Sequence, residues 1–224
     1  MWYVTSQKFG GSALGLQRIL GLGSYRTAWS WLHKMRHAMV RPDRELLTGV
    51  VEIDETMIGG EHHGGKRGRG SENKYIIVIA VEIFEPKGFG RVRMKQIESA
   101  DSENLQSFIN DNVEKGSQVR TDSWKGYAAV KDNGYTHKKV NISQSGDPAH
   151  VSMPGVHRIA SLLKRWLLGT HQGSVSSKHL DYFLDEYTFR FNRRKSKSLG
   201  MLFYRLLQQA VRIQAVTYRE LADG

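Results

Sequence analysis

The chain has 224 residues, of which 39% are hydrophobic, so it is long enough and apolar enough to bury a core. Lys and Arg number 33 against 22 Asp and Glu, which gives a formal net charge of +11 and predicts a polyanionic partner, with nucleic acid favoured over an anionic membrane. No apolar stretch approaches the roughly 18 residues of a membrane span. The absence of cysteine excludes disulfides and cysteine-ligated zinc, and fits a cytoplasmic setting.

Residues 1–48 are predicted to form a small helical segment and a linker. Ser12 is placed to cap a short helix, GLGS forms a turn, and Ser24 is placed to cap a second helix over Tyr25–Met39. Residues predicted to face the core are Ala28, Trp31, Leu32 and Met35, and those predicted to face outward are Arg26, Lys34, Arg36 and His37. Two short helices joined by a glycine-containing turn, the second one basic, outline a helix-turn-helix, and a helical hairpin packed on the main domain fits the pattern equally well.

From residue 49 onward the pattern is of strands followed by helices, and we predict one domain over 49–224. The predicted strands are 50–58, 74–85, 90–97, 118–121 and 136–142, and the predicted helices are 102–115, 156–168, 178–192 and 198–216. Three antiparallel strands before the first long helix are typical of a ribonuclease-H-like core. The expected fold class is therefore α/β, with a mixed five-stranded sheet and flanking helices, preceded by the small helix-turn-helix segment.

One aspartate lies within a predicted strand of this domain, and another directly follows one. Asp54 lies inside the apolar run VVEIDETMI, where an unpaired carboxylate is unfavourable, so either a metal ion or a buried Arg or Lys is its expected partner. Glu52 and Thr56 share its strand face and Glu52 could assist, whereas Glu55 points the other way. Asp122 follows the short strand before SWKGY, where it either begins a turn or faces Asp54 from a neighbouring strand.

His157 is the third residue of interest, because it falls on the first turn of the amphipathic helix in PGVHRIASLLKRW. The alternative for a lone helical histidine is a surface or satisfied core residue. Lys164 follows seven residues later, nearly two helical turns, and so shares the face of His157. Two carboxylates on strands and a third ligand on a helix are what a two-metal phosphoryl-transfer site requires.

Basic residues elsewhere are candidates for contacts with nucleic acid. The glycine-rich segment 59–74 lacks the lysine-serine ending of a phosphate-binding P-loop and is best interpreted as a hairpin tip that closes on DNA. The run FRFNRRKSKS combines arginines with aromatic residues, which suits binding to a nucleic-acid backbone. The predicted DNA-binding residues are Arg26, Lys34, Lys66, Arg67, Arg69, Lys164, Arg165, Arg193 and Arg194.

Six stretches together resemble a known family. They are SYRTAWSWLHKMRHAM, VEIDETMIGG, GKRGRG, TDSWKGY, LLKRWLLGTHQG and LDEYTFRFNRR. In order and spacing they resemble the DDE superfamily of transposases and integrases, and more closely the ISXO-two-like insertion-sequence transposases. The resemblance implies Asp54, Asp122 and His157 as ligands of two divalent ions, with histidine standing where Glu or Asn is commoner, and it implies that Lys164 contacts a DNA phosphate beside the scissile bond. An imidazole ligand favours Mn²⁺ over Mg²⁺.

The function predicted from these features is a DNA transposase that cleaves insertion-sequence ends and joins the freed 3′-hydroxyl to target DNA. The resemblance further implies double-stranded DNA as partner, a homodimer or larger assembly on that DNA, and a place in the cytoplasm with the nucleoid. Two alternatives remain open: a ribonuclease-H-type nuclease that only hydrolyses, and an inactive DNA-binding relic. Glu186, in LDEYTFRFNRR, is the next candidate for the third ligand if His157 is not one.

Overall fold

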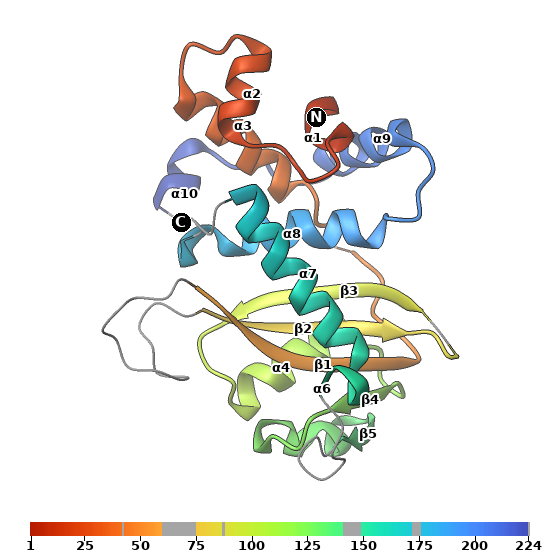
Figure 1. Ribbon diagram of the computed structural model, residues 1–224. Helices are drawn as coiled ribbons and strands as arrows, with labels where there is room; N and C mark the ends of the chain where they lie inside the picture. Colours follow the sequence, from red (N-terminus) through yellow and green to blue (C-terminus); the bar gives the residue numbers. More distant parts are fainter. Residues whose placement is uncertain (42, 60–74, 87, 141–148, 172–175, 224) are drawn as a thin grey trace. The chain divides into compact units, whose positions relative to one another are not determined.

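The chain forms two compact units, one from Met1–Arg44 with Trp166–Gly224 and the other from Glu45–Arg165. The computed structural model describes residues 1–41, 43–59, 75–86, 88–140, 149–171 and 176–223 (Figure 1). The helices that follow Arg165 therefore belong to the same compact unit as the N-terminal helices. The predicted DNA-binding segment over 1–48 and the predicted catalytic domain over 49–224 stay predictions.

The unit Glu45–Arg165 is built on one mixed sheet. Its strands are β1 (Val50–Ile58), β2 (Tyr75–Ile83), β3 (Phe89–Ile97), β4 (Gln118–Thr121) and β5 (Thr136–Lys139). The strand order is β3-β2-β1-β4-β5, in which β1 pairs antiparallel with β2 and β2 with β3, while β4 pairs parallel with both β1 and β5. This is the ribonuclease-H-like α/β arrangement that the sequence predicted, and the prediction is confirmed.

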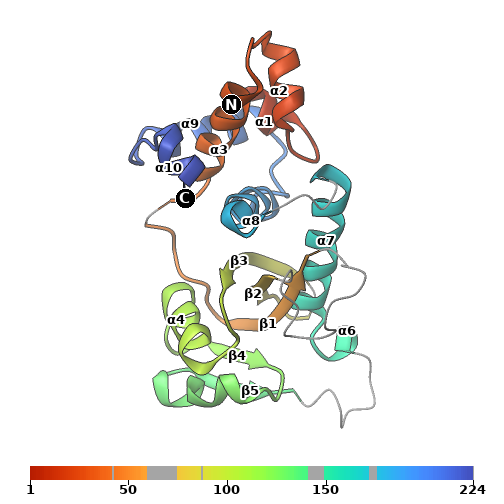
Figure 2. The ribbon, with the colours of Figure 1, turned by 90° about the vertical axis from the view of Figure 1, so that its left-hand side faces the viewer.

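Helices cover both faces of this sheet (Figure 2). On one face lie α4 (Ser102–Asn112), which begins after the capping side chain of Asp101, and the 3₁₀ segment η1 (Lys125–Asn133). The opposite face is crossed by α7 (Pro154–His171), which follows the short α6 (Ala149–Ser152). Apolar residues from β1, β2, β4, α4 and η1 form one buried cluster that includes Val51, Ile53, Val78, Ala80, Phe108, Val119 and Tyr127.

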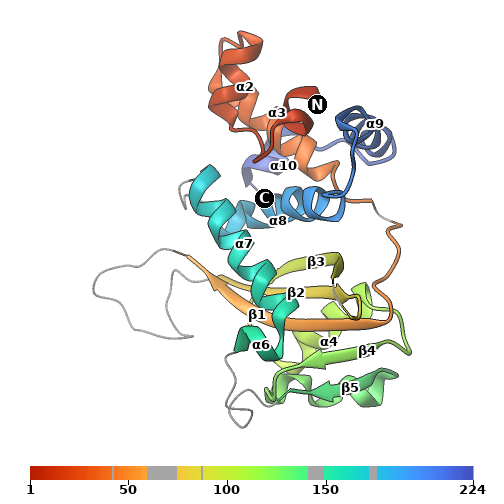
Figure 3. The same ribbon diagram turned by 45° about the vertical axis from the view of Figure 1, so that its right-hand side comes forward.

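The second unit is helical (Figure 3). Its helices are α1 (Trp2–Ser6), α2 (Ala13–Leu20), α3 (Tyr25–His37), α8 (Ser177–Asn192), α9 (Leu199–Ala210) and α10 (Tyr218–Asp223). Their core holds Leu16, Ala28, Leu32, Phe189 and Leu206, all of them buried. None of the helices that the structure describes is long and apolar enough to cross a bilayer.

Helix boundaries in this unit match the expectation only in part. The Ser12 side chain accepts a hydrogen bond from the Gly15 N–H at 3.0 Å, as a capping residue does, whereas Ser24 stands at the N-cap of α3 without a side-chain capping bond. The helix predicted over 198–216 ends at Ala210. The following residues VRIQAVT include four that are β-branched, and such side chains are restricted in a helix, so this ending has a local reason.

Two residues of α3 contradict the predicted faces of that helix. Trp31, expected in the core, is 48% exposed, and Arg36, expected to face outward, is 2% exposed. Arg36 is buried because its Nε donates to Glu186 Oε2 at 2.8 Å and its guanidinium lies 4.0 Å from the ring centre of Phe183. A buried guanidinium is tolerated where a carboxylate and an aromatic ring receive it. Helical periodicity alone contains no information about such a partner, which comes from another helix.

Candidate active site

Asp54 is the central residue of β1, opposite Ile79 of β2. Its carboxylate is half-buried, and Oδ1 accepts the backbone N–H of Glu55 at 2.9 Å. Burial raises the pKa of Asp54, and the nearby negative charge of Asp122 raises it further, against the opposing effects of the Glu55 N–H and His157. The two aspartates are therefore close enough to repel one another, which is a situation that a cation relieves.

Asp122 reaches this place through strand pairing. β4 runs parallel to β1, with Arg120 opposite Glu52, so that the end of β4 lies beside the middle of β1. Asp122 follows directly, and its Oδ1 accepts the Trp124 N–H at 2.9 Å, which closes a turn. Two alternatives were predicted for Asp122, a turn residue or a neighbour of Asp54. In the structure Asp122 is both.

His157 meets Asp54 from α7. Its Nε2 lies 3.8 Å from Asp54 Oδ2, and the side chains are 29% and 18% exposed. That nitrogen is itself buried, and it forms no hydrogen bond with any residue that the structure describes. An imidazole nitrogen without a hydrogen bond, facing a carboxylate of raised pKa, fits a position for a divalent ion between the two groups.

Glu52 determines where α7 begins. Its buried carboxylate accepts the backbone N–H groups of Gly155 at 2.7 Å and Val156 at 3.2 Å, in the first turn of the helix. Burial raises the pKa of Glu52, while the two N–H groups act in the opposite direction. A carboxylate at a helix N-terminus is favourable because unpaired N–H groups and the helix dipole meet it there. Glu52 was predicted from the sequence only to assist Asp54, and in the structure it positions the helix that carries His157.

Tyr127 is a further residue near these carboxylates, and no role was predicted for it from the sequence. Its side chain is completely buried in η1, and burial together with the negative charges of Glu55, Asp54 and Asp122 raises its pKa well above the ordinary value. The phenol therefore stays protonated and able to donate a hydrogen bond beneath the carboxylates. The signal was present, because Tyr127 closes the motif TDSWKGY that begins at Thr121.

Comparison with known proteins identifies the family. A protein family described as "ISXO2-like transposase domain" matches residues 46–192 of the chain. The chain belongs to the ISXO2-like transposase family. No curated protein matches this family member significantly. Among solved structures, this chain is similar to the catalytic core domain of BIV integrase. The TM-score is 0.42 and the identity is 18%, over 75% of this chain and 99% of the integrase chain. An intasome of simian T-cell lymphotropic virus in complex with PP2A regulatory subunit B56 gamma has a TM-score of 0.37 and 16% identity, over 80% of this chain and 65% of that chain.

The predicted DNA-binding residues of this ISXO2-like chain fall into four groups. Lys164 and Arg165 are exposed on α7, in the unit that holds the site, and Arg26 and Lys34 are exposed on α3. Lys66, Arg67 and Arg69 lie outside the described residues, as does the whole glycine-rich segment over 60–74. Arg193 and Arg194 follow α8, and their guanidinium groups lie over aromatic rings of that helix.

Glu186, the reserve candidate for the third ligand, lies in the helical unit. Its carboxylate is fully buried, with Oε2 accepting from Arg36 at 2.8 Å and Oε1 accepting from Arg190 Nε at 2.9 Å. Although burial raises the pKa of Glu186, the two arginines outweigh it and hold that pKa below the ordinary value. Glu186 therefore makes a buried ion pair between α3 and α8, and the role of ligand stays with His157 as a prediction.

Proposed function

We propose that this ISXO2-like chain is a DNA transposase that cleaves insertion-sequence ends and joins the freed 3′-hydroxyl to target DNA by two-metal phosphoryl transfer. The observation that carries the proposal is the 3.8 Å approach of His157 Nε2 to Asp54 Oδ2, beside Asp122, in a chain of this family. The nitrogen is buried without a hydrogen bond from the described residues, so the position favours a positively charged ligand.

Asp54, Asp122 and His157 would hold Mg²⁺ or Mn²⁺. When bound, a pair of such ions supplies activation of the attacking oxygen and stabilisation of the leaving oxygen at phosphorus. Within the described part of the chain, no three Asp, Glu or His side chains already stand close enough to hold one ion. Asp54 and Asp122 each accept a backbone N–H through Oδ1, from Glu55 and from Trp124. Their Oδ2 atoms would be the oxygens that hold the ion.

The residues around the ligands prepare the site before any ion arrives. The Glu55 N–H orients the Asp54 carboxylate, and Glu52 holds the N-terminus of α7 so that His157 faces it. Tyr127 supplies a buried phenol close to the carboxylates of Glu55, Asp54 and Asp122. Such preorganisation matters for phosphoryl transfer because the protein contributes mainly positioning and electrostatic stabilisation.

DNA contacts would come from cations on both units. Lys164, exposed on α7 after His157, would bind a phosphate beside the scissile bond. Arg26 and Lys34 on α3 would contact the transposon end, together with Arg165, Arg193, Arg194 and the segment that contains Lys66, Arg67 and Arg69. The substrate is double-stranded DNA, and two ends held together imply a homodimer or larger assembly. The setting would be cytoplasmic, on the nucleoid.

The experiment that tests the proposal is a strand-transfer assay with precleaved transposon ends, a labelled target and either Mg²⁺ or Mn²⁺. Joined products are expected with wild type and absent with Asp54→Asn. A chain that nicks DNA in the same buffer without joining it is a ribonuclease-H-type nuclease. Salt-sensitive DNA binding without metal-dependent cutting identifies a relic. Either result overturns the proposal.

A further inference from the structure

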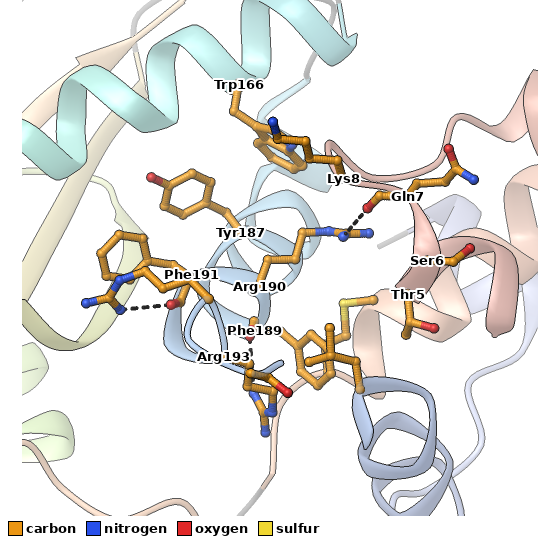
Figure 4. Close-up of a pocket in the computed structure, with 14 residues that line it drawn as sticks. Thr5, Ser6, Gln7, Lys8, Trp166, Tyr187, Phe189, Arg190, Phe191 and Arg193 are labelled. Atoms are coloured by element: carbon orange, nitrogen blue, oxygen red, sulfur yellow. Dashed lines mark hydrogen bonds between the residues drawn. The ribbon is translucent and has the colours of Figure 1, made fainter. Parts of the chain in front are cut away.

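The helical unit contains a pocket of about 600 Å³ (Figure 4). It lies between α1, α8 and Trp166, the residue of α7 at which the second segment of this unit begins. Its apolar wall is largely aromatic, formed by Trp166, Tyr187, Phe189 and Phe191. Tyr187 and Phe191 are stacked, with an interplanar angle of 15° and ring centres 6.1 Å apart. A pocket of this size is in the range that small ligands occupy, and its flat aromatic faces favour a flat ligand.

Cations share the lining of this pocket with the rings. They are Lys8, Arg190, Arg193 and Arg194, and none of the described lining residues is acidic. Arg193 lies 4.0 Å above the Phe189 ring and Arg194 lies 3.9 Å above the Phe191 ring. Burial, followed by the positive charges of Arg41 and Arg205, lowers the pKa of Arg193 to about 10, which still leaves it charged at neutral pH. This concentration of positive charge favours an anionic ligand.

The walls of the pocket are tied together by hydrogen bonds. Arg190 donates to Glu186 Oε1 at 2.9 Å and to the carbonyl of Gln7 at 2.9 Å, which joins α8 to the segment after α1. Trp166 Nε1 donates to the carbonyl of Phe9 at 2.7 Å and joins α7 to the same segment. Arg190 is thus committed to the wall, and these hydrogen bonds hold the pocket walls in place, so binding has little to order.

A ligand for this pocket must be flat, able to stack and accompanied by negative charge. A nucleotide has these properties, because its base has a π face whatever its identity and its phosphate pairs with arginine or lysine. We propose that the pocket binds one unstacked nucleobase of a DNA strand against the aromatic wall that Trp166, Tyr187 and Phe191 form. Lys8 and Arg194 hold the adjoining phosphates. The inference rests on the proposed function for its partner, DNA, and adds a subsite for an unpaired nucleotide.

The test compares two single-stranded probes that carry the same number of phosphates. One is an octamer of thymidylate and the other is an octamer in which every base is missing. Stacking of one base is worth about 1–3 kcal/mol, so wild type should prefer the thymidylate octamer by roughly fivefold to 150-fold. Phe191→Leu should remove most of this preference while retaining affinity for the abasic octamer. Arg194→Gln should weaken binding of both probes.

Tyr204→Leu is the matched control, because Tyr204 is an exposed aromatic on α9 and is not among the lining residues. It should keep the wild-type preference, and unfolding midpoints of all variants show which of them are folded. Equal affinity of wild type for both probes overturns the pocket, as does an equal loss on both probes in Phe191→Leu. The nucleobase proposal also fails if Phe191→Leu keeps the base preference but changes the oligomeric state. That result would indicate that a second copy of the chain occupies the pocket. If duplex binding and strand transfer persist in any of these cases, the proposed function stands and only the pocket fails.

Discussion

Glu52 and Gly155, 103 residues apart in the sequence, meet where the helix that carries His157 begins. The Glu52 carboxylate accepts the Gly155 N–H at 2.7 Å, and a Cβ at residue 155 would lie 2.7 Å from Glu52 Oε2 and 2.5 Å from Ile83 Cδ1. A side chain at residue 155 would therefore force the Glu52 carboxylate or the Ile83 side chain to shift. A β1 residue thereby determines both the start and the position of α7, and through α7 the place of the His157 imidazole beside Asp54.

Changing this contact should lower both stability and activity. Glu52→Ala leaves two buried N–H groups without an acceptor, so we expect a loss of about 2–4 kcal/mol of unfolding free energy. Gly155→Ala should displace α7 and reduce cleavage at least tenfold even where the protein is folded. The measurements are urea unfolding and metal-dependent nicking per folded molecule.

Glu82→Gln is the matched control for Glu52, since Glu82 is a buried glutamate of β2 that accepts from Arg91 and Thr48 rather than from α7. It should lower stability but leave nicking by folded molecules near the wild-type rate. Full activity in folded Gly155→Ala would show that α7 need not be held in this position.

Asp54→Asn and Asp122→Asn should each abolish cleavage, by a factor of about a thousand or more, and leave DNA affinity within a few fold of wild type. The reason is that both residues are assigned to the metals rather than to phosphate. Nicking with Mg²⁺ and with Mn²⁺, together with duplex binding, gives both quantities. Asp111→Asn, an exposed aspartate of α4, should behave as wild type. Near wild-type cutting by either site variant removes that aspartate from the site.

His157→Ala should lose activity, whereas His157→Glu should retain it with Mg²⁺, because a carboxylate suits that harder ion better than imidazole does. Wild type should prefer Mn²⁺, and His157→Glu should shift the preference towards Mg²⁺. The ratio of rates in the two metals is the measurement. Arg158→Ala, the next and exposed residue of α7, should leave that ratio unchanged. An unaltered ratio in His157→Glu would falsify the ligand assignment.

DNA affinity should decrease steeply with salt concentration. The formal net charge is +11, and a contact with about 6–10 phosphates predicts a loss of roughly three or more decades in affinity between 50 and 200 mM salt. Lys164→Gln should make the slope of log affinity against log salt shallower by about 0.9, which corresponds to the loss of one phosphate contact. Fluorescence anisotropy with a labelled duplex measures both slopes. A flat response in wild type would argue against a nucleic-acid partner.

The helical unit should lose stability as the pH falls below neutrality. Burial, followed by nearby charges including Arg36, lowers the pKa of His33 to about 3 and that of His171 to about 4. Both values lie below the usual pKa of unfolded histidine, about 6.5, so the unfolded chain binds these protons first. The contribution is present above about pH 6.5 and is lost as the pH falls towards the folded pKa values. Between pH 7 and pH 5 we expect a loss of about 1–2 kcal/mol per histidine.

Urea unfolding at pH 7, 6 and 5 checks this dependence on pH. His33→Gln should make the dependence shallower, since one of the two protonation sites is then gone. His37→Gln, a half-buried histidine of the same helix, serves as its control. Identical pH dependence in wild type and His33→Gln would contradict the assignment.

Local patterns were sufficient to predict the sheet and the family. Alternating and continuous apolar runs located β1, β3 and β4 closely, because burial of one or both strand faces selects apolar residues by position. The same patterns placed Asp54 within a strand and Asp122 directly after another, and the six motifs pointed to the transposase family that the match over 46–192 shows. These features depend on a residue and its near neighbours, and they are therefore readable from one sequence.

Only the tertiary structure decided which polar residues are buried and what they contact. Arg36 is inside because Glu186 receives it from 150 positions away, and Glu52 caps a helix that begins about 100 residues later. Tyr127 acquired its place beneath the carboxylates in the same way, by the packing of η1 on the sheet. Burial of a charged or polar group is favourable only when a partner meets it, and such a partner can come from any part of the chain. Periodicity specifies which face of an element is apolar, but the pairing of buried polar groups is a property of the folded chain.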